Sequence, residues 1–374
     1  MVTGTRAEYG LLSRLMRLID ESEDCQLQVV ATNMHLLPEY GNTYQEIEKD
    51  GFRIDAKVLM RKTTDDAYGV IASMAEEMNG MNEALRELCP DMVVILGDRY
   101  EMLVVATVAM LQRIPIAHLH GGEISEGAMD DSIRHSITKM SSLHFTSTEE
   151  YRRRVIQLGE QPERVFYVGA MGVENLKKVP LMRKLELEDS LNFKFEGLSV
   201  SVTLGNRIPK DEISDLLKAL DSFSSLKVLF TMPNSDQGGE EIRSAIEAYC
   251  VRNEERCRCF KSLGVRRYLS ALGYVTAVVG NSSSGLLEVP SAHIPTLNIG
   301  DRQKGRTRGA SVVDVASDEA SIVKGLQKVL SPNFRAFCKT TTNPYEKEGT
   351  AESIFKVIST YSLDTFLQKS FYNL

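Results

Sequence analysis

The sequence predicts an α/β protein built from two doubly wound parallel sheets, and three observations carry this prediction. Short β-branched runs alternate with amphipathic helical stretches along most of the chain, as in proteins made of βαβ units. This alternation weakens over residues 172–197, which are charged and rich in lysine, and then restarts. A length of 374 residues corresponds to two domains, or at most three. We therefore predict two similar halves that face a central cleft, where such sheets bind their ligands.

The predicted strands are short runs of β-branched and other apolar residues. In the first half they cover residues 29–32, 92–96, 114–119, 144–146 and 165–168. In the second half they cover residues 198–204, 227–232, 258–261, 275–279 and 296–299. A helix is predicted over residues 65–88, because its apolar residues recur every three or four positions. They are Ile71, Met74, Ala75, Met78, Met81, Leu85 and Leu88.

The composition excludes several classes of protein. The 51 acidic and 44 basic residues leave a net charge of -7, whereas non-specific nucleic-acid binding needs a broad basic surface. No apolar run approaches the ~18 residues of a membrane-spanning helix, and we expect no signal peptide. Six scattered cysteines predict reduced thiols in a cytoplasm rather than a disulfide scaffold. The pair Cys257 and Cys259 lacks the second pair of ligands that a zinc site needs.

Two turns of the first half are candidate binding sites. Gly4 and Arg6 lie where a glycine turn leads into a helix, whose N-terminal N–H groups can hold an anion beside the arginine charge. Asp98 follows the strand over 92–96, and an acid at the carboxyl end of a strand points into the cleft. The alternatives are an ordinary turn with a surface arginine, and an aspartate that caps the next helix.

A third group of candidates follows the strand over 114–119. It combines two histidines at alternate positions with several charged residues: His118, His120, Glu123, Asp130, Asp131 and Arg134. Histidines on one face of a strand allow a metal pair, although nothing in the spacing fixes a ligand geometry. Carboxylates crowded around an arginine shift one another's pKa values, which proton-transfer chemistry needs. A helix start capped by Asp130 is the remaining alternative.

A fourth group follows the strand over 275–279. The small-residue turn Gly280-Asn281-Ser282-Ser283-Ser284-Gly285 runs into a predicted helix, so its N–H and hydroxyl groups can hold a phosphate. Glu288, about one helical turn further, is placed to accept hydrogen bonds from ribose hydroxyls. Arg302 and Arg306 supply positive charge for a diphosphate. The turn is neither a P-loop nor a nucleophile elbow, and a bland serine-rich turn is the alternative.

Two anion sites in different halves, with acids between them, indicate a nucleoside diphosphate that carries a group to be reacted on. The dinucleotide fingerprint Gly-x-Gly-x-x-Gly follows none of the predicted strands, which disfavours a dehydrogenase.

Together these segments closely resemble the hydrolysing UDP-N-acetylglucosamine 2-epimerases of bacterial sialic-acid synthesis. The likeness extends over nearly the whole chain, and the motifs occur in order. They lie at residues 4–9, 97–101, 118–123, 131–139, 280–285 and 300–306.

The resemblance implies the glycosyltransferase-B fold, which consists of two Rossmann-like domains. We expect the first domain at residues 1–170, the UDP-binding domain at 171–355 and a C-terminal helix at 356–374 that returns to the first domain. The implied phosphate and ribose ligands are Asn281, Ser282, Ser283, Glu288, Arg302, Arg306 and, from the first domain, Arg6. The implied surroundings of the sugar are Asp98, His120, Glu123, Asp130, Asp131 and Arg134.

The reaction that the resemblance implies is the loss of UDP and of the C2 proton to give 2-acetamidoglucal, followed by addition of water and release of N-acetylmannosamine. A positioned base and a stabilised leaving group would share the work. No metal or other cofactor is expected. The expected partners are the UDP-sugar substrate and further copies of the chain in a homo-oligomer, a dimer or a tetramer, with no nucleic acid and no membrane.

Two departures from the family pattern concern the site. Some relatives carry a glutamate where this chain has His120, so we expect Asp98 with Asp130 or Asp131 to act instead. Relatives also carry a His-Pro pair near the start of the second domain, and that histidine contacts the phosphate region. Its position here falls on Val200 or, in a second alignment, on Gly205, and the sequence has no histidine between His144 and His293.

Three alternatives to the main interpretation stay open. A close variant would act on a UDP-linked 2,4-diacetamido-trideoxyhexose of the legionaminic-acid route. A glycosyltransferase of the same fold would need an acceptor before it released UDP. A UDP-sugar sensor would bind the nucleotide without turnover, and the absent histidine is compatible with that class.

Overall fold

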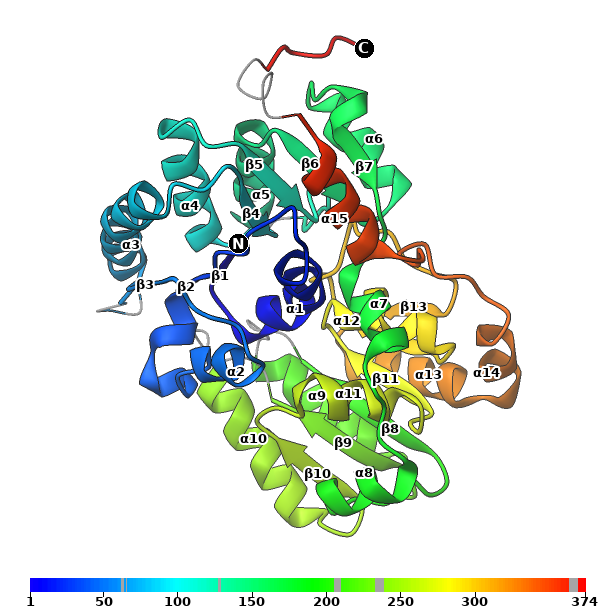
Figure 1. Ribbon diagram of the computed structural model, residues 1–374. Helices are drawn as coiled ribbons and strands as arrows, with labels where there is room; N and C mark the ends of the chain where they lie inside the picture. The colour runs from blue at the N-terminus through cyan, green and yellow to red at the C-terminus, as the bar shows by residue number, and fades with distance from the viewer. Residues whose placement is uncertain (62–63, 65, 127–128, 205–209, 233–238, 363–368) are drawn as a thin grey trace. The chain divides into compact units, whose positions relative to one another are not determined.

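The computed structural model of the protein describes residues 1–61, 64, 66–126, 129–204, 210–232, 239–362 and 369–374. The chain forms two compact units (Figure 1). Unit 1 comprises Met1–Glu174 together with Lys347–Leu374, and unit 2 comprises Asn175–Glu346. Every strand pair of the described residues is parallel, and helices alternate with the strands. The predicted fold class of two doubly wound α/β units is therefore confirmed.

Unit 2 contains one six-stranded sheet in the order β10-β9-β8-β11-β12-β13. Its strands are β8 (Ser199–Thr203), β9 (Lys227–Thr231), β10 (Cys257–Phe260), β11 (Ala277–Gly280), β12 (Thr296–Ile299) and β13 (Val312–Val315). The chain order reverses between β8 and β11, as in dinucleotide-binding folds, and ligands bind beyond the carboxyl ends of the strands at such a point. β13 was not predicted, because its side chains are only partly buried and one of four is an aspartate.

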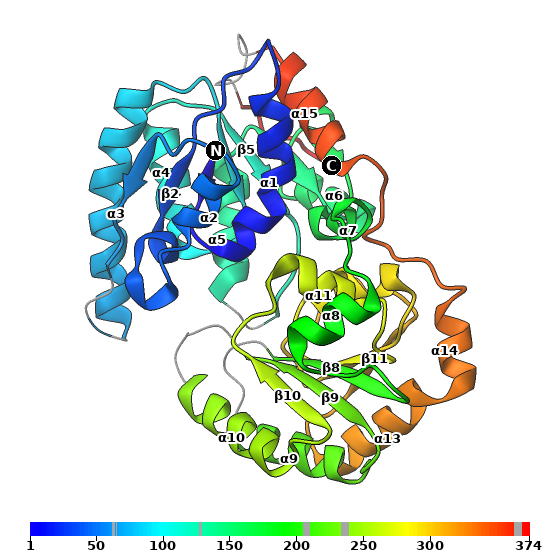
Figure 2. The ribbon, with the colours of Figure 1, turned by 60° about the horizontal axis from the view of Figure 1, so that its bottom comes forward.

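Helices cover both faces of the unit 2 sheet. Figure 2 shows α9 (Lys210–Asp221), α10 (Gly239–Arg252) and α13 (Glu319–Leu330) along one face, and α8 (Lys184–Leu191) and α11 (Gly264–Leu272) along the other. Successive strand residues point to opposite faces, so Val278 packs in one core and Val279 in the other. The shorter helices of this unit are α12 (Ser284–Leu287) and α14 (Pro332–Cys338). The predicted joining region contains α8 and most of α7 (Met171–Lys178).

Unit 1 repeats the same winding in two smaller sheets. One is β1 (Val2–Thr3), β2 (Val30–Thr32) and β3 (Ala56–Val58). The other is β4 (Val93–Leu96), β5 (Ile116–Leu119), β6 (Leu143–Thr146) and β7 (Val165–Tyr167). β4 lies beside β1, so the chain order reverses there too. β3 was not predicted, because one of its three residues is an exposed lysine.

Two layers of helices enclose the sheets of unit 1. The apolar side chains of α1 (Arg6–Asp20) and α15 (Thr350–Thr360) form one core with one face of the strands. Those of α3 (Ala67–Leu88), α4 (Tyr100–Leu111) and α5 (Met129–Met140) form the core of the other face. The remaining helices are α2 (Tyr44–Lys49) and α6 (Glu149–Gln157). No helix of the described residues is long and apolar enough to cross a membrane.

Two predicted helices differ in detail. α3 begins at Ala67 after the capping residue Asp66, but part of its predicted buried stripe is wrong. Ile71 and Met78 are exposed, and the buried face instead passes through polar Glu77. The C-terminal helix α15 packs on α1, but it runs from Thr350 to Thr360, earlier than the predicted 356–374, and residues 369–374 contain neither helix nor strand.

Candidate functional site

Two turns leave the strands of unit 1 at the point where the chain order reverses. The turn after β4 contains Gly97, whose φ of +83° is in the left-handed region that glycine adopts without strain. Asp98 follows it, and its carboxylate pairs with Arg134 of α5. The residue that caps α4 is Arg99, with no side-chain cap. The alternative role of Asp98 as a helix cap is therefore wrong, and the aspartate belongs to a charged cluster.

Arg134 is the centre of this cluster. Its side chain is 1% exposed, and it pairs with both Asp98 and Asp131. Its Nη1 also donates to the carbonyl of Glu123 at 2.8 Å, and the backbone N–H of Ser125 donates to Asp131 Oδ1 at 2.7 Å. A buried guanidinium must be surrounded by acceptors, so these contacts hold two carboxylates close to one point.

Asp130 and Asp131 differ in their exposure to solvent. Both lie in the first turn of α5, but Asp130 is exposed and Asp131 is partly buried. Of the two aspartates that the sequence left open, Asp131 is the one held in the Arg134 cluster. Geometry therefore favours Asp131 as the second carboxylate of the site.

Glu123 and His120 form a second polar group at the same end of the strands. His120 Nδ1 lies 3.3 Å from Glu123 Oε1, and the Ser147 hydroxyl donates to the same oxygen at 2.9 Å. Glu123 is 4% exposed. His120 Nε2 is buried and has no hydrogen-bond partner among the described residues. This nitrogen is available to a ligand.

The two histidines have different partners and different backbone conformations, which argues against the metal-pair alternative. His118 lies inside β5, whereas His120 follows the strand with a φ of +64°. His118 Nε2 is 2.7 Å from the carbonyl of Gly97, and Nδ1 is 3.3 Å from the Thr138 hydroxyl. Burial lowers the pKa of His118 to about 3, so it is a neutral structural residue beneath the Gly97 turn. The described residues contain no group of three His, Cys, Asp or Glu side chains placed to hold a metal ion.

The turn before α1 differs from the predicted anion site. Thr5 caps the helix, and Glu8 Oε2 accepts from the N–H groups of Gly4 at 2.8 Å and Thr5 at 3.2 Å. Part of the expected anion cradle is therefore filled by the helix's own carboxyl group. Arg6 is partly exposed, and its guanidinium lies 3.5 Å from Glu46.

A buried acidic cluster that the sequence interpretation missed connects the two turns. Glu8, Glu77 and Glu101 are 8%, 0% and 0% exposed. Arg99 Nε is 2.5 Å from Glu101 Oε1 and 4.0 Å from Glu8 Oε1, and the Thr32 hydroxyl donates to Glu77 at 2.9 Å. Burial, reinforced by Glu101, raises the pKa of Glu77 to about 9 and that of Glu8 to about 7. The one sequence signal for this cluster is the Thr-x-x-Glu spacing of Thr5 and Glu8, which is typical of a capping box and predicts that Glu8 turns back toward the start of the helix.

The serine turn of unit 2 follows β11 as predicted. Gly280 has a φ of +136°, and a Cβ there would lie 2.0 Å from the carbonyl oxygen of Thr203, so only glycine fits. The hydroxyls of Ser282 and Ser283 are partly exposed and make no hydrogen bond with the described residues. α12 has four residues only, which is shorter than expected. Hydroxyl groups and the turn backbone, rather than a long helix, are therefore the groups that can hold a phosphate.

The arginine loop is tied to the serine turn. Asn281 is 7% exposed, and its carbonyl accepts from Arg302 Nη1 at 3.0 Å and Gln303 Nε2 at 2.8 Å. Arg308 donates to the carbonyls of Gln303 and Arg306 at 2.9 and 3.2 Å. The structure thus brings Arg302 next to the serine turn, and Arg306 lies in the same loop. Gln303 and Arg308, which sequence reasoning missed, are the residues that shape the loop.

Tyr268, which sequence reasoning also missed, lies close to both the serine turn and Glu288. The Tyr268 hydroxyl is 2.6 Å from Ser284 Oγ. Burial, and then the negative charge of Glu288, raise the pKa of Tyr268. Tyr268 therefore stays a neutral hydroxyl that fixes the turn beside Glu288.

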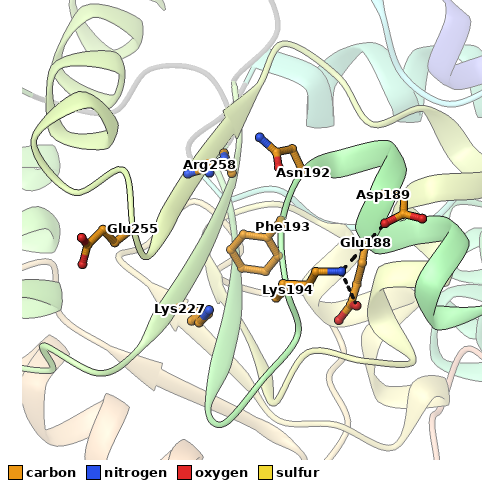
Figure 3. Close-up of a pocket in the computed structure, with 8 residues that line it drawn as sticks. All are labelled: Glu188, Asp189, Asn192, Phe193, Lys194, Lys227, Glu255 and Arg258. Carbon is orange, nitrogen blue, oxygen red and sulfur yellow. Dashed lines mark hydrogen bonds and ion pairs between the residues drawn. The ribbon is translucent and has the colours of Figure 1, made fainter.

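A pocket of about 290 Å³ lies at the opposite edge of the unit 2 sheet (Figure 3). Lys227 begins β9 and Arg258 lies near the start of β10, so the pocket is at the amino ends of the strands. Its lining includes Lys194, which pairs with Glu188 and Asp189. Ligands of doubly wound sheets bind at the carboxyl ends of the strands, so this pocket lies at the other end from the serine turn.

β8 decides between the two candidate positions, Val200 and Gly205, for the histidine that relatives carry near the start of the second domain. Val200 pairs with Val228 and Ala277 in the middle of the sheet and is 0% exposed. A side chain there points into a core and cannot contact a ligand. The alignment on Val200 is therefore wrong, and the second position, Gly205, lies outside the described residues.

The fold and both polar clusters define the class of protein first: an α/β protein of two doubly wound units, with carboxylates around a buried arginine in one and a serine turn beside an arginine loop in the other. Comparison with known proteins gives the family. The chain matches the UDP-N-acetylglucosamine 2-epimerase family over residues 17–359. It belongs to this family, and the expected class of enzyme, a UDP-sugar 2-epimerase, is confirmed.

Individual relatives cover nearly the whole chain. It is 41% identical to the GDP/UDP-N,N′-diacetylbacillosamine 2-epimerase (hydrolyzing) of Campylobacter jejuni, over 100% of this chain and 98% of that protein. It is 40% identical to the polysialic acid biosynthesis protein P7 of Escherichia coli, over 96% and 93%. A crystal structure of UDP-GlcNAc 2-epimerase from Neisseria meningitidis bound to UDP-GlcNAc has a TM-score of 0.80 at 15% identity, over 96% and 98%. That likeness supports the fold.

The buried acidic cluster predicts a pH dependence of stability. Glu77 holds its proton up to about pH 9 when folded, whereas an unfolded glutamate loses it near pH ~4.3. The protonated carboxyl group therefore contributes its full share to the free energy of unfolding below pH ~4.3. As the pH rises toward 9, that free energy falls by up to about 1.4 kcal/mol per pH unit. Glu77→Gln keeps the neutral form at every pH. We expect the thermal unfolding midpoint of Glu77→Gln to fall less than that of the native chain when the pH is raised from about 5 to about 8.

The matched control is Glu83→Gln, which changes an exposed residue of the same helix. It should leave the pH dependence of the native chain unaltered. Identical slopes for Glu77→Gln and the native chain would show that Glu77 is ionised in the fold.

Proposed function

We propose that the chain is a hydrolysing 2-epimerase that releases UDP from a UDP-linked 2-acetamido sugar and inverts the sugar at C2. The observation that carries this proposal is the pair of carboxylates, Asp98 and Asp131, held by the buried guanidinium of Arg134. Removal of a weakly acidic C–H proton needs a base in a fixed place. Family membership supplies the substrate class.

The proposed reaction has two balanced steps. In the first, a carboxylate of the Arg134 cluster takes the C2 proton, the C–H electrons form a C1–C2 double bond, and the C1–O bond breaks as UDP leaves with its electron pair. In the second, water adds across the double bond, its hydroxyl to C1 and a proton to C2 from the opposite face, and the proton taken in the first step passes to UDP or to solvent. The net change is UDP-sugar plus water to UDP plus the 2-epimeric sugar. We assign the proton transfers to Asp98 and Asp131, with Asp130 as the second candidate beside Asp131.

The leaving group needs stabilisation of its negative charge. We assign this to the hydroxyls of Ser282 and Ser283, with Arg302, Arg306 and Arg6 as cations. Charge-assisted bonds to a departing phosphate are among the strongest that side chains make. We assign Asn281 the role of holding this turn in shape, because its backbone carbonyl accepts hydrogen bonds from Arg302 and Gln303. Glu288 is assigned to the ribose.

His120 and Glu123 are assigned to the sugar. The unpartnered Nε2 of His120 is a donor or acceptor of a hydrogen bond to a sugar hydroxyl or acetamido group, whichever tautomer it adopts. Glu123 orients that ring through Nδ1. A site that hydrogen-bonds a polar group of its substrate strongly rejects analogues that lack it, so these residues contribute to specificity.

Two nucleotide sugars compete as the substrate. The relative from Campylobacter jejuni, 41% identical, is named for N,N′-diacetylbacillosamine, which supports a UDP-2,4-diacetamido-trideoxyhexose as the first candidate. The relative from Escherichia coli, 40% identical, is named for polysialic acid biosynthesis, which supports UDP-N-acetylglucosamine, N-acetylmannosamine as product and a role in sialic-acid or capsule synthesis.

One experiment tests the reaction and the substrate together. The chain is incubated in deuterated water with each nucleotide sugar, and kcat/KM and deuterium at C2 are measured. We expect one deuterium at C2 of the freed sugar, a higher kcat/KM for the diacetamido sugar, and a kcat about 100-fold lower for Asp98→Asn. UDP release only after an acceptor is added would identify a glycosyltransferase. Tight UDP binding without free sugar would identify a sensor.

The missing histidine predicts opposite effects at its two candidate positions. Gly205→His is expected to raise kcat on the order of tenfold, because the histidine of the relatives is expected to contact the phosphate region. Val200→His places a polar ring in a core and is expected to cost about 2 kcal/mol or more of unfolding free energy without a gain in kcat. Steady-state kinetics and thermal unfolding measure both. A gain in kcat for Val200→His would contradict the placement of that residue.

A homo-oligomer and a cytoplasmic location complete the proposal. Large apolar side chains are exposed on α3 (Tyr68 76%, Ile71 66%) and on α4 (Leu111 72%, Met110 44%), and such surfaces commonly form subunit interfaces. We expect sedimentation to show a dimer or tetramer, and Leu111→Lys to weaken it. A native chain that sediments as a monomer would contradict the proposed homo-oligomer. The six cysteines are free, in agreement with a reducing compartment.

A further inference from the structure

The C-terminal residues 369–374 dock on the unit 1 segments that follow α5 and α6. The Tyr372 N–H donates to the carbonyl of Gly159 at 2.9 Å, and Gln161 Nε2 donates to the Ser370 hydroxyl at 2.8 Å. A Cβ at Gly159 would lie 2.2 Å from the Phe371 ring, so the ring sits directly on this glycine. These contacts place the preceding residue, Lys369, at the end of α5.

Lys369 caps the carboxyl end of α5. Its ammonium donates to the carbonyls of Thr138, Lys139 and Ser141 at 3.2, 2.8 and 2.7 Å. The last carbonyls of a helix have no partner within it and carry partial negative charge, so a cation there is stabilising. Three of the acceptors around the ammonium thus belong to this helix end and the residue that follows it.

A buried carboxylate fixes the same ammonium from the other side. Glu160 is 1% exposed and lies 2.6 Å from Lys369 Nζ, 2.6 Å from Lys139 Nζ and 2.9 Å from His144 Nε2. His144 is the register partner of His118 on the neighbouring strand. The cap is thus tied through Glu160 to β6, the strand beside β5.

The other end of α5 carries the proposed chemistry. Asp131 and Arg134 lie in its first half, and Thr138 lies one turn beyond Arg134. Neutral His118 donates from Nε2 to the carbonyl of Gly97, and its Nδ1 lies 3.3 Å from the Thr138 hydroxyl, which donates to the carbonyl of Arg134 at 3.0 Å. One residue, Thr138, therefore contacts the Gly97 turn through His118 and the tail through its own carbonyl.

Half of the fully buried residues of α5 are polar, so polar contacts share in holding the helix in position. Its buried residues are Ile133, Arg134, Ile137 and Thr138, of which two are apolar. Met140, at the carboxyl end, is only partly buried against the same core, so the contacts of Lys369 add to the hold on this end of the helix. Loss of those contacts would let the end shift. Such a shift would move Asp131 relative to Asp98.

We propose that Lys369 is a positioning residue, which holds the carboxyl end of α5 so that Asp131 and Arg134 keep their places beside Asp98. This inference rests on the proposed function. It does not make Lys369 a catalytic residue, because the ammonium contacts the helix and not the site.

The test uses the full chain with Lys369→Met, which keeps the length of the side chain and removes its donors. We expect kcat to fall about tenfold or more, because small displacements of catalytic groups cost this much, while KM changes by less than about twofold. Backbone hydrogen exchange of residues 129–140 should become faster, and that of α1 should not change. Lys369→Arg restores donors and charge and should regain most of the kcat.

The matched control is Lys347→Met. Lys347 Nζ also donates to a backbone carbonyl in unit 1, that of Tyr167 at 2.6 Å, but it does not touch α5. An unchanged kcat and unchanged exchange in Lys369→Met would overturn the proposal, and so would an equal loss of kcat in Lys347→Met. If Lys369→Met unfolds at the assay temperature, Phe371→Ala loosens the tail while keeping the lysine. It should then show a smaller loss of kcat with faster exchange in α5, and the absence of both effects would overturn the proposal.

The outcomes separate this inference from the proposed function. If the native chain turns over neither nucleotide sugar, the proposed function fails. The exchange of α5 amides still reports whether the lysine holds the helix, because that measurement needs no substrate.

Discussion

The charge of Arg134 is the constraint on which the candidate site depends. A guanidinium that is 1% exposed cannot remain without acceptors, and the fold supplies two carboxylates and a backbone carbonyl around it. These contacts join the turn after β4, the turn after β5 and the start of α5. Loss of the arginine would leave two carboxylates without a counter-charge, whereas loss of one aspartate would leave a buried cation incompletely paired. The same contacts that stabilise unit 1 thus place its acid–base groups.

The parallel winding of each unit explains why polar residues gather at one edge of the strands. Parallel strands end on the same side, so the turns after β1, β4 and β5 bring together residues that are far apart in the sequence. In unit 2 the turn after β11 and the loop after β12 meet for the same reason, through the carbonyl of Asn281. Gly97 and Gly280 allow the backbone conformations that these turns need.

The strands with strong apolar signals were predicted closely, because burial on both faces demands continuous apolar runs. β3 and β13 escaped because one or more of their residues are polar or half-exposed. The stripe on α3 was partly wrong, since Ser73 and Glu77 occupy buried positions that the periodicity assigned to Ile71 and Met78. Glu77 is tolerated there because it meets Thr32 and holds a proton, and periodicity carries no information on such pairing.

The order of apolar runs, glycine turns and charged motifs by itself determined the fold class, the family and the candidate residues of both sites, because those features are local in the chain. Only the tertiary structure decided which candidates meet. It joined Asp98 to Arg134, distinguished Asp131 from Asp130, and separated His118 from His120. It also brought Lys369 to the end of a helix some 230 residues earlier in the chain. Contacts of this kind depend on how helices pack on strands, and the spacing of residues in a sequence does not specify that packing.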